Sequence, residues 1–94
     1  MNKLKLFVTS KFKKDARRAA KRGKDLSKLD EVIAQLLAQE KLPQSTRDHE
    51  LVGSYYGHRE CHIEPDWLLI YRIDNNELIL TAVRTGTHSD VFDE

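Results

Sequence analysis

The sequence predicts a small α+β fold, in which one antiparallel sheet carries an N-terminal helical hairpin on one of its faces. Two observations lead to this prediction. Between residues 10 and 40, apolar residues recur at intervals of three and four, which is the period of an amphipathic helix. From residue 54 onward they alternate with polar residues, which is the period of a strand. The expected order of elements is β-α-α-β-β-β, in a single domain spanning residues 1–94.

The first strand and the first helix are expected within residues 3–22. Apolar residues at positions 4, 6 and 8 alternate with lysines at positions 3 and 5, as in a half-buried strand. Thr9 or Ser10 can cap the helix that follows, because a hydroxyl there accepts a hydrogen bond from an unpaired first-turn N–H. Gly23 is a natural end to this helix, since glycine adopts the left-handed conformation easily.

The second helix carries the clearest pattern in the chain. Ser27 with Asp30 approximates a capping box near its start, and Pro43 disfavours helical geometry before it, so the helix should end near Glu40. Residues 41–53 then form a polar loop that contains His49. Six apolar residues repeat at helical spacing: Leu26, Leu29, Val32, Ile33, Leu36 and Leu37.

The second half of the chain reads as the sheet. Tyr55-Tyr56 and residues 59–64 make one or two strands interrupted at Gly57, and further strands are expected over residues 67–73 and 77–84. Pro65 cannot donate to a ladder and therefore marks a corner between strands. Residues 74–77 make a hairpin turn, because asparagine tolerates positive φ at its centre. A helical turn is expected near the end of residues 85–92.

Composition narrows the class of protein. The chain is 39% hydrophobic and 33% charged, as in ordinary globular domains, and no apolar run approaches the roughly 20 residues that cross a bilayer. Residues 1–8 lack the continuous apolar core of a secretory signal. Cys61 is the only cysteine, which excludes an intrachain disulfide and a thiolate metal cage. We therefore expect a cytoplasmic protein without contact to a membrane.

The net charge of +1 conceals two halves of opposite sign. Residues 1–24 hold ten lysines and arginines against Asp15 alone, whereas residues 25–94 hold six against fourteen acidic residues. A segment of +9 favours a polyanionic or acidic partner, although a solvated helix face is the alternative. The basic residues of the first helix that could meet such a partner are Lys13, Lys14, Arg17, Arg18, Lys21 and Arg22.

Four histidines supply the candidate chemistry. His62 and Asp66 flank the corner at Pro65, while His49 precedes the sheet and His88 follows it, so a folded meander can bring these residues to one edge. Histidine transfers protons in both directions near neutral pH. Acyl transfer is disfavoured because no nucleophile motif is present. A zinc site from the same four residues has suitable donors but no compact ligand motif, so no metal is expected.

The remaining chemistry is metal-independent cleavage of RNA, in which a base removes a 2′-hydroxyl proton and an acid protonates the leaving oxygen. Arg59 and Arg84 are candidates to steady the charge on phosphorus, with an ion pair to Glu60, Glu64 or Asp66 as the alternative role. Trp67 and Phe92 could stack on an unpaired base, and Trp67 could equally be a core residue.

Two long motifs carry a family resemblance. Residues 59–71 (RECHIEPDWLLIY) and 84–92 (RTGTHSDVF), with Asp48-His49-Glu50-Leu51, Gly53 and the basic first helix, resemble the YafQ toxins of the RelE/ParE superfamily. The resemblance covers nearly the whole chain and implies a RelE-like fold.

The resemblance further implies a toxin of a type II toxin–antitoxin pair. Such a toxin is a ribosome-dependent endoribonuclease that cuts messenger RNA in the A site of the 70S ribosome, needs no cofactor and is silenced by a cognate, DinJ-like antitoxin. The family's catalytic positions fall on His49, His62, Asp66 and His88, with Trp67 and Phe92 in support. Two alternatives stay open: a binding member of the superfamily without activity, and a ParE-like inhibitor of gyrase.

Overall fold

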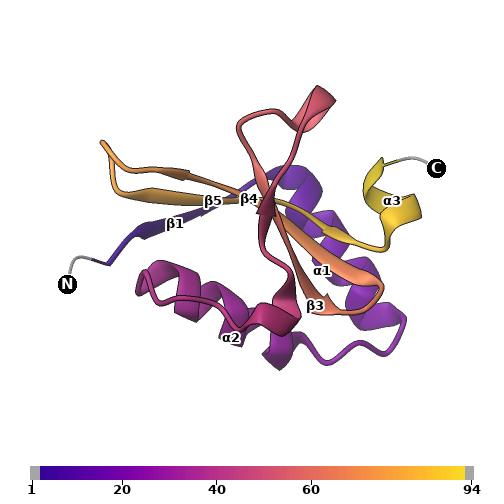
Figure 1. The fold of residues 1–94 in the computed structure, drawn as a ribbon. Coiled ribbons are helices and arrows are strands. Elements are labelled where there is room, and N and C mark those ends of the chain that lie inside the picture. Colours follow the sequence, from indigo (N-terminus) through magenta and orange to yellow (C-terminus); the bar gives the residue numbers. More distant parts are fainter. Residues whose placement is uncertain (1–2, 93–94) are drawn as a thin grey trace.

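The structure, a computed structural model, describes residues 3–92, so the predicted limits of the domain at residues 1 and 94 lie outside the described residues. Five strands form one sheet in the order β1-β5-β4-β3-β2, with two long helices together on one face (Figure 1). The strands are β1 (Lys5–Val8), β2 (His49–Glu50), β3 (Arg59–Glu64), β4 (Trp67–Asp74) and β5 (Ile79–Gly86).

The sheet is mixed, which corrects the prediction of a purely antiparallel one. The pairs β2–β3, β3–β4 and β4–β5 are antiparallel, but β1 pairs in parallel with β5, with Lys5 opposite Ile79 and Val8 opposite Ala82. Parallel neighbours need a long crossover, and here both helices and the rest of the sheet lie between the two strands in sequence. The alternation of apolar and polar residues in a strand shows which face of the sheet each side chain occupies. It does not show whether the neighbouring strand runs parallel or antiparallel.

The predicted helices are present, with small differences at their ends. In α1 (Ser10–Lys21), Thr9 is the N-cap, and its hydroxyl accepts from Phe12 N at 3.0 Å. In α2 (Leu26–Leu37), the cap is Asp25 rather than the predicted Ser27. This helix ends before Glu40 because Gln39 takes a positive φ of 58°.

Three short elements have no periodic pattern long enough to predict them. They are the 3-10 turns η1 (Gln44–Thr46) and η2 (Gly53–Tyr55) and the two-residue strand β2, which replaces part of the expected loop. In the turn between β4 and β5, Leu78 rather than an asparagine takes the positive φ, while Asp74 Oδ1 accepts from Asn76 N. The helical turn expected near the end of the chain is α3 (His88–Phe92).

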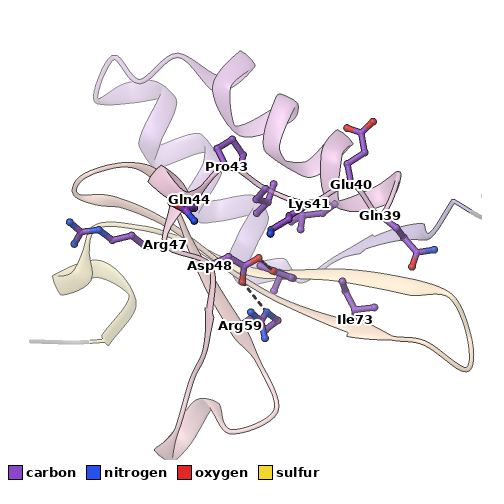
Figure 2. Close-up of a pocket in the computed structure, with 12 residues that line it drawn as sticks. Gln39, Glu40, Lys41, Pro43, Gln44, Arg47, Asp48, Arg59 and Ile73 are labelled. Carbon is purple, nitrogen blue, oxygen red and sulfur yellow. Dashed lines mark hydrogen bonds and ion pairs between the residues drawn. The ribbon is translucent and has the colours of Figure 1, made fainter.

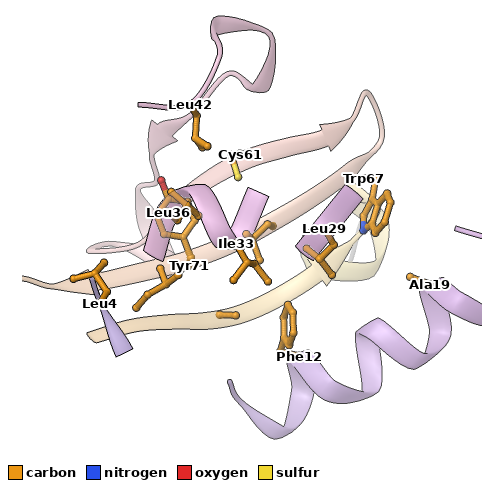
Figure 3. Close-up of a cluster of buried hydrophobic side chains, with 13 residues drawn as sticks. Leu4, Phe12, Ala19, Leu29, Ile33, Leu36, Leu42, Cys61, Trp67 and Tyr71 are labelled. Atoms are coloured by element: carbon orange, nitrogen blue, oxygen red, sulfur yellow. The ribbon is translucent and has the colours of Figure 1, made fainter. Parts of the chain in front are cut away.

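The core lies between the sheet and the two long helices (Figure 3). Phe12 comes from α1, and Leu29 and Ile33 come from α2, against Leu69 of β4 and Leu80 of β5. Each such side chain contributes about 1.5–3 kcal/mol when it is fully buried. Both helices bury their apolar stripes on this face. On the opposite face, Leu68 and Ile70 of β4 are fully buried as well, whereas β3 carries the polar residues Glu60 and His62 there. No helix within residues 3–92 is long and apolar enough to cross a membrane.

Candidate active site

Polar groups converge on the sheet face that the long helices leave uncovered. Cys61 of β3 is fully buried in the core, and successive side chains of a strand point to opposite faces. Glu60 and His62 therefore point away from the helices. Burial raises the pKa of the Cys61 thiol to about 12, which makes it a poor nucleophile, as expected.

Glu60 links two of the predicted histidines and was not predicted. Its Oε2 lies 3.3 Å from His49 Nε2 and 4.0 Å from His62 Nε2, although the residue is only 4% exposed. The register of β2 with β3 places His49 directly opposite Glu60. A signal was present in the sequence, because Glu60 is two residues from His62 in a strand and therefore shares its face.

The ring of His49 is held between a backbone carbonyl and Glu60. His49 Nδ1 lies 2.7 Å from the carbonyl oxygen of Arg47, which can only accept, so Nδ1 donates. Nε2 lies 3.3 Å from Glu60 Oε2, so the two groups form an ion pair when the imidazole is protonated.

His88 comes from α3 and meets Asp66 at the corner between β3 and β4. Asp66 Oδ1 accepts from His88 Nδ1 at 3.1 Å and from its backbone N at 3.3 Å. These hydrogen bonds lower the pKa of the Asp66 carboxyl. Because Nδ1 is used, Nε2 of His88 is left to act on a substrate. The His88 ring centroid lies 5.9 Å from that of His62, so the four predicted residues and Glu60 form one continuous group.

The corner that carries Asp66 is anchored to the second helix. Glu64 accepts from Lys24 Nζ and Lys28 Nζ, each at 2.8 Å. The bond from Lys24, then that from Lys28, lowers the pKa of the Glu64 carboxyl to about 2. The predicted turn at Pro65 is present, and these ion pairs fix its position relative to α2.

The two predicted aromatic residues take different places. Trp67 is 1% exposed, and its Nε1 donates to Thr85 Oγ1 at 3.0 Å, so the ring is a core residue and is not available to stack on a base. Phe92 is half-buried, and its ring lies 6.1 Å from His88 and 5.7 Å, edge to face, from Tyr55. Stacking by Phe92 stays a prediction.

Neither predicted arginine is a free phosphate ligand in this structure. Arg59 Nε donates to Asp48 at 2.9 Å, and Arg84 Nε donates to Asp15 at 2.6 Å. Both therefore take the alternative role of ion-pair partner, but with carboxylates other than those considered. The partners were missed because Asp15 lies 69 residues from Arg84 in the sequence.

The six basic residues predicted to meet a polyanionic partner divide into two groups. Arg18 pairs with Asp15 at 2.8 Å and Arg22 pairs with Asp90 at 2.6 Å, so these two are occupied by acidic residues of the same chain. The others are exposed or half-exposed and make no ion pair with any residue from 3 to 92. This second group is Lys13, Lys14, Arg17 and Lys21.

Three groups of the site could also hold a metal ion. One ligand atom each from Glu60, His62 and His88 lies within 4.8 Å of the others. Imidazole and carboxylate are donors that zinc and copper accept. The zinc site considered from the sequence combined His49, His62, Asp66 and His88. Of these four residues, only His62 and His88 belong to this cluster.

One hollow of the described surface lies away from this cluster, at the C-terminal end of α2. It has a volume of about 550 Å³, and Lys41, Arg47, Asp48 and Arg59 line it (Figure 2). A second hollow of about 380 Å³ lies beside His62 and is lined also by Thr46 and Pro65. The histidine cluster therefore borders an open hollow rather than a closed cavity.

Proteins with this fold and a similar sequence form a class of bacterial toxins. Residues 4–93 match the family model described as "Bacterial toxin of type II toxin-antitoxin system, YafQ". The mRNA interferase toxin YafQ of Escherichia coli K12 is 40% identical over 85 residues, which are 89% of this chain and 90% of that protein. The chain belongs to the YafQ family of type II toxins.

Solved structures agree with this assignment. The crystal structure of YafQ from E. coli BL21(DE3) aligns with a TM-score of 0.89 at 37% identity and covers 95% of this chain and 98% of that one. YafQ in the E. coli DinJ–YafQ toxin–antitoxin complex aligns with a TM-score of 0.86 at 37% identity, over 96% and 98% of the two chains. The predicted family and the α+β fold are confirmed. The predicted enzyme class is that of the K12 relative, an mRNA interferase.

Proposed function

We propose that this protein is a ribosome-dependent endoribonuclease that cuts messenger RNA in the ribosomal A site by metal-independent acid–base catalysis. The observation that carries the proposal is the continuous group formed by His49, Glu60, His62, His88 and Asp66 on the uncovered face of the sheet. The activity in the name of the E. coli relative supports the same conclusion.

The reaction needs two proton transfers on opposite sides of one phosphorus. The 2′-oxygen loses its proton to a base and forms a bond to phosphorus, while the bond from phosphorus to the 5′-oxygen breaks and that oxygen takes a proton from an acid. His88 suits the base, because Asp66 holds its Nδ1 and stabilises the imidazolium that forms, while Nε2 is the ring nitrogen left to take the proton. The His49–Glu60 pair suits the acid, because the Glu60 carboxylate, 3.3 Å from His49 Nε2, would stabilise an imidazolium that donates to the leaving oxygen.

His62 suits a third role, stabilisation of the charge on the phosphorus oxygens. Its Nδ1 lies 3.2 Å from the Thr46 carbonyl oxygen, and its Nε2 lies 4.0 Å from Glu60. With Arg59 and Arg84 engaged by Asp48 and Asp15, an imidazole between the proposed base and acid is the available donor. Phe92 beside His88 would stack on a base of the codon.

The exposed basic residues of α1 would bind ribosomal RNA through its phosphates. Lys13, Lys14 and Arg17 have no acidic partner among residues 3–92, unlike Arg18 and Arg22. Each phosphate contact releases counterions, so ribosome binding should weaken as salt rises. Alanine at Lys13, Lys14 and Arg17 should reduce the slope of log affinity against log salt by about 2–3. An unchanged slope would assign these residues to a solvated helix face.

A cognate antitoxin is the expected protein partner. The solved E. coli complex joins YafQ to DinJ, and the family to which this chain belongs is one of toxin–antitoxin pairs. We infer a DinJ-like antitoxin that silences this chain by binding it. The proposed substrates, ribosomes and messenger RNA, would place its action in the cytoplasm.

Expression of His88→Ala beside the wild type tests the proposal in cells. The variant should relieve growth arrest and remove new messenger 3′ ends that fall within codons. His58→Ala is the matched control, because the ring of His58 hydrogen-bonds to the backbone of Tyr55 and Tyr56 and packs edge to face on the Tyr55 ring, away from the proposed reacting groups. Growth arrest by the wild type without new 3′ ends would favour a binding protein or a gyrase inhibitor instead.

A further inference from the structure

The helix that carries His88 cannot hold its own position. α3 has five residues, little more than one turn, and helices of this length are not stable in isolation. The hydrogen bond between His88 and Asp66 adds little, because the two side chains are 50% and 68% exposed. The position of the His88 ring must therefore depend on other contacts of α3.

Asp90 makes several of these contacts through its side chain, and the ion-pair partner of that side chain is Arg22 at the end of α1. Arg22 donates to both of its carboxylate oxygens, at 2.6 Å and 3.3 Å, in the two-pronged geometry that fixes orientation best. Within α3, Asp90 Oδ2 also accepts from Thr87 N at 3.0 Å, and Asp90 N donates to Thr87 Oγ1 at 3.0 Å. The bond from Arg22 lowers the pKa of the Asp90 carboxyl to about 2, so the pair is ionised at neutral pH.

A second tie runs from α1 through Arg84. Asp15 is 3% exposed and accepts from Arg84 Nε at 2.6 Å and from Thr85 N at 3.1 Å. The same guanidinium donates from Nη2 to the Asp90 carbonyl oxygen at 3.2 Å. Asp15, the only acidic residue of the first 24, thus holds the segment that leads into α3.

Glycine at position 86 shows how closely the parts fit. Its φ is +150°, and an added Cβ would lie 2.9 Å from Cβ and Oδ2 of Asp90. The backbone at Gly86, just before α3, therefore lies in contact with the Asp90 side chain, which is the side chain that Arg22 binds. A shift of Asp90 would move both the start of α3 and His88, two residues before it.

We propose that α1 positions His88 for the reaction, with Arg22 acting through Asp90 and Asp15 acting through Arg84. The inference rests on the proposed function only in naming His88 as a reacting group. It divides the basic residues of the first helix into a group that would bind RNA and a group that would position the active site. Arg18 and Arg22, which the sequence analysis named among the candidates to meet a polyanionic partner, belong to the positioning group, since both lie within ion-pair distance of Asp90.

Three variants test the proposal with two measurements. Arg22→Met removes the ion pair at a residue whose side chain is 47% exposed, and Asp90→Asn removes its charge while keeping an oxygen for Thr87 N. Arg72→Met is the matched control, an exposed arginine of β4 without an ion pair among residues 3–92. The measurements are the cleavage rate of a defined message on ribosomes at saturating protein, and the His88 imidazole resonances of the free protein, assigned with His88→Ala.

Arg22→Met should lower the saturated rate about 10- to 100-fold, because small displacements of a reacting group have effects of this size, with little change in the half-saturating concentration. The His88 resonances should shift in Arg22→Met and should stay unchanged in the Arg72→Met control. The double variant Arg22→Met/Asp90→Asn should lose no more than the worse single variant, since both remove one contact.

Unchanged His88 resonances in Arg22→Met, additive losses in the double variant, or an effect on half-saturation alone would overturn the proposal. The last result would return Arg22 to RNA binding. If the wild-type protein does not cleave RNA, the proposed function fails, and the resonances by themselves decide whether α1 positions His88.

Discussion

Replacement of Asp15 by asparagine is the most demanding test of how α1 is joined to the sheet. The carboxylate is 3% exposed and accepts four hydrogen bonds: two from Arg84, one from Arg18 and one from Thr85 N. Asparagine has nearly the same shape but only one accepting oxygen, and its NH₂ group would face guanidinium donors. The substitution therefore leaves Arg84, which is itself 16% exposed, without a counter-charge.

The expected loss in the free energy of unfolding follows from this geometry. Removing one partner of a buried ion pair costs about 3–5 kcal/mol, because the remaining charge is left uncompensated. For a domain of this size, each kcal/mol lowers Tm by about 4–8 °C. The variant should therefore melt roughly 12–40 °C below the wild type.

Thermal unfolding followed by circular dichroism measures this difference. Asp30→Asn is the control, a helical carboxylate of α2 that is exposed and makes no ion pair with any residue from 3 to 92. Its effect should stay within about 0.5 kcal/mol. If Asp15→Asn loses less than about 1 kcal/mol, which is the range of an exposed pair, the buried network does not hold α1 to β5 as described.

Three further outcomes are expected from the same region. Gly86→Ala should displace α3 and reduce RNA cleavage, because the new Cβ would meet Asp90 at 2.9 Å; an unchanged crystal structure and rate would contradict this. Trp67→Phe should cost about 1–3 kcal/mol in urea unfolding, since it removes the donor to Thr85 Oγ1 in the core, and no loss would contradict a structural Trp67. Arg22 lowers the pKa of Asp90 from 3.8 to about 2, so the stability from this pair is present above about pH 4 and is lost as pH falls towards 2. Asp90→Asn should remove that part of the pH dependence, and an unaltered acid profile would show that the pair contributes nothing to folding.

Local periodicity carried most of the fold prediction. The limits of β3 at Arg59 and Glu64 agree with the predicted ones, and the Pro65 corner and the Thr9 cap are where the sequence placed them. The parallel pairing of β1 with β5 could not be foreseen, because a strand's own pattern contains no information about its neighbour. The positive φ of Leu78 was missed for a different reason, since tertiary packing overrode the preference of asparagine.

The sequence predicted which residues make up the site, but it did not predict which of them contact one another. His49 and His88 were proposed to converge on the Pro65 corner, and the structure does bring them to one group with His62 and Asp66. Glu60 was considered only as a partner for an arginine. Burial decided the role of Trp67, and burial of a side chain beside a turn cannot be judged from spacing alone.

The central claim is that this histidine–carboxylate cluster cuts messenger RNA on the ribosome. The direct measurement combines purified protein, purified ribosomes and a defined message, and maps the 3′ ends with and without ribosomes. We expect cleavage within the A-site codon only when ribosomes are present, and a loss of at least about 100-fold for His88→Ala. Equal cleavage by His88→Ala, or no cleavage by the wild type on programmed ribosomes, would contradict the account.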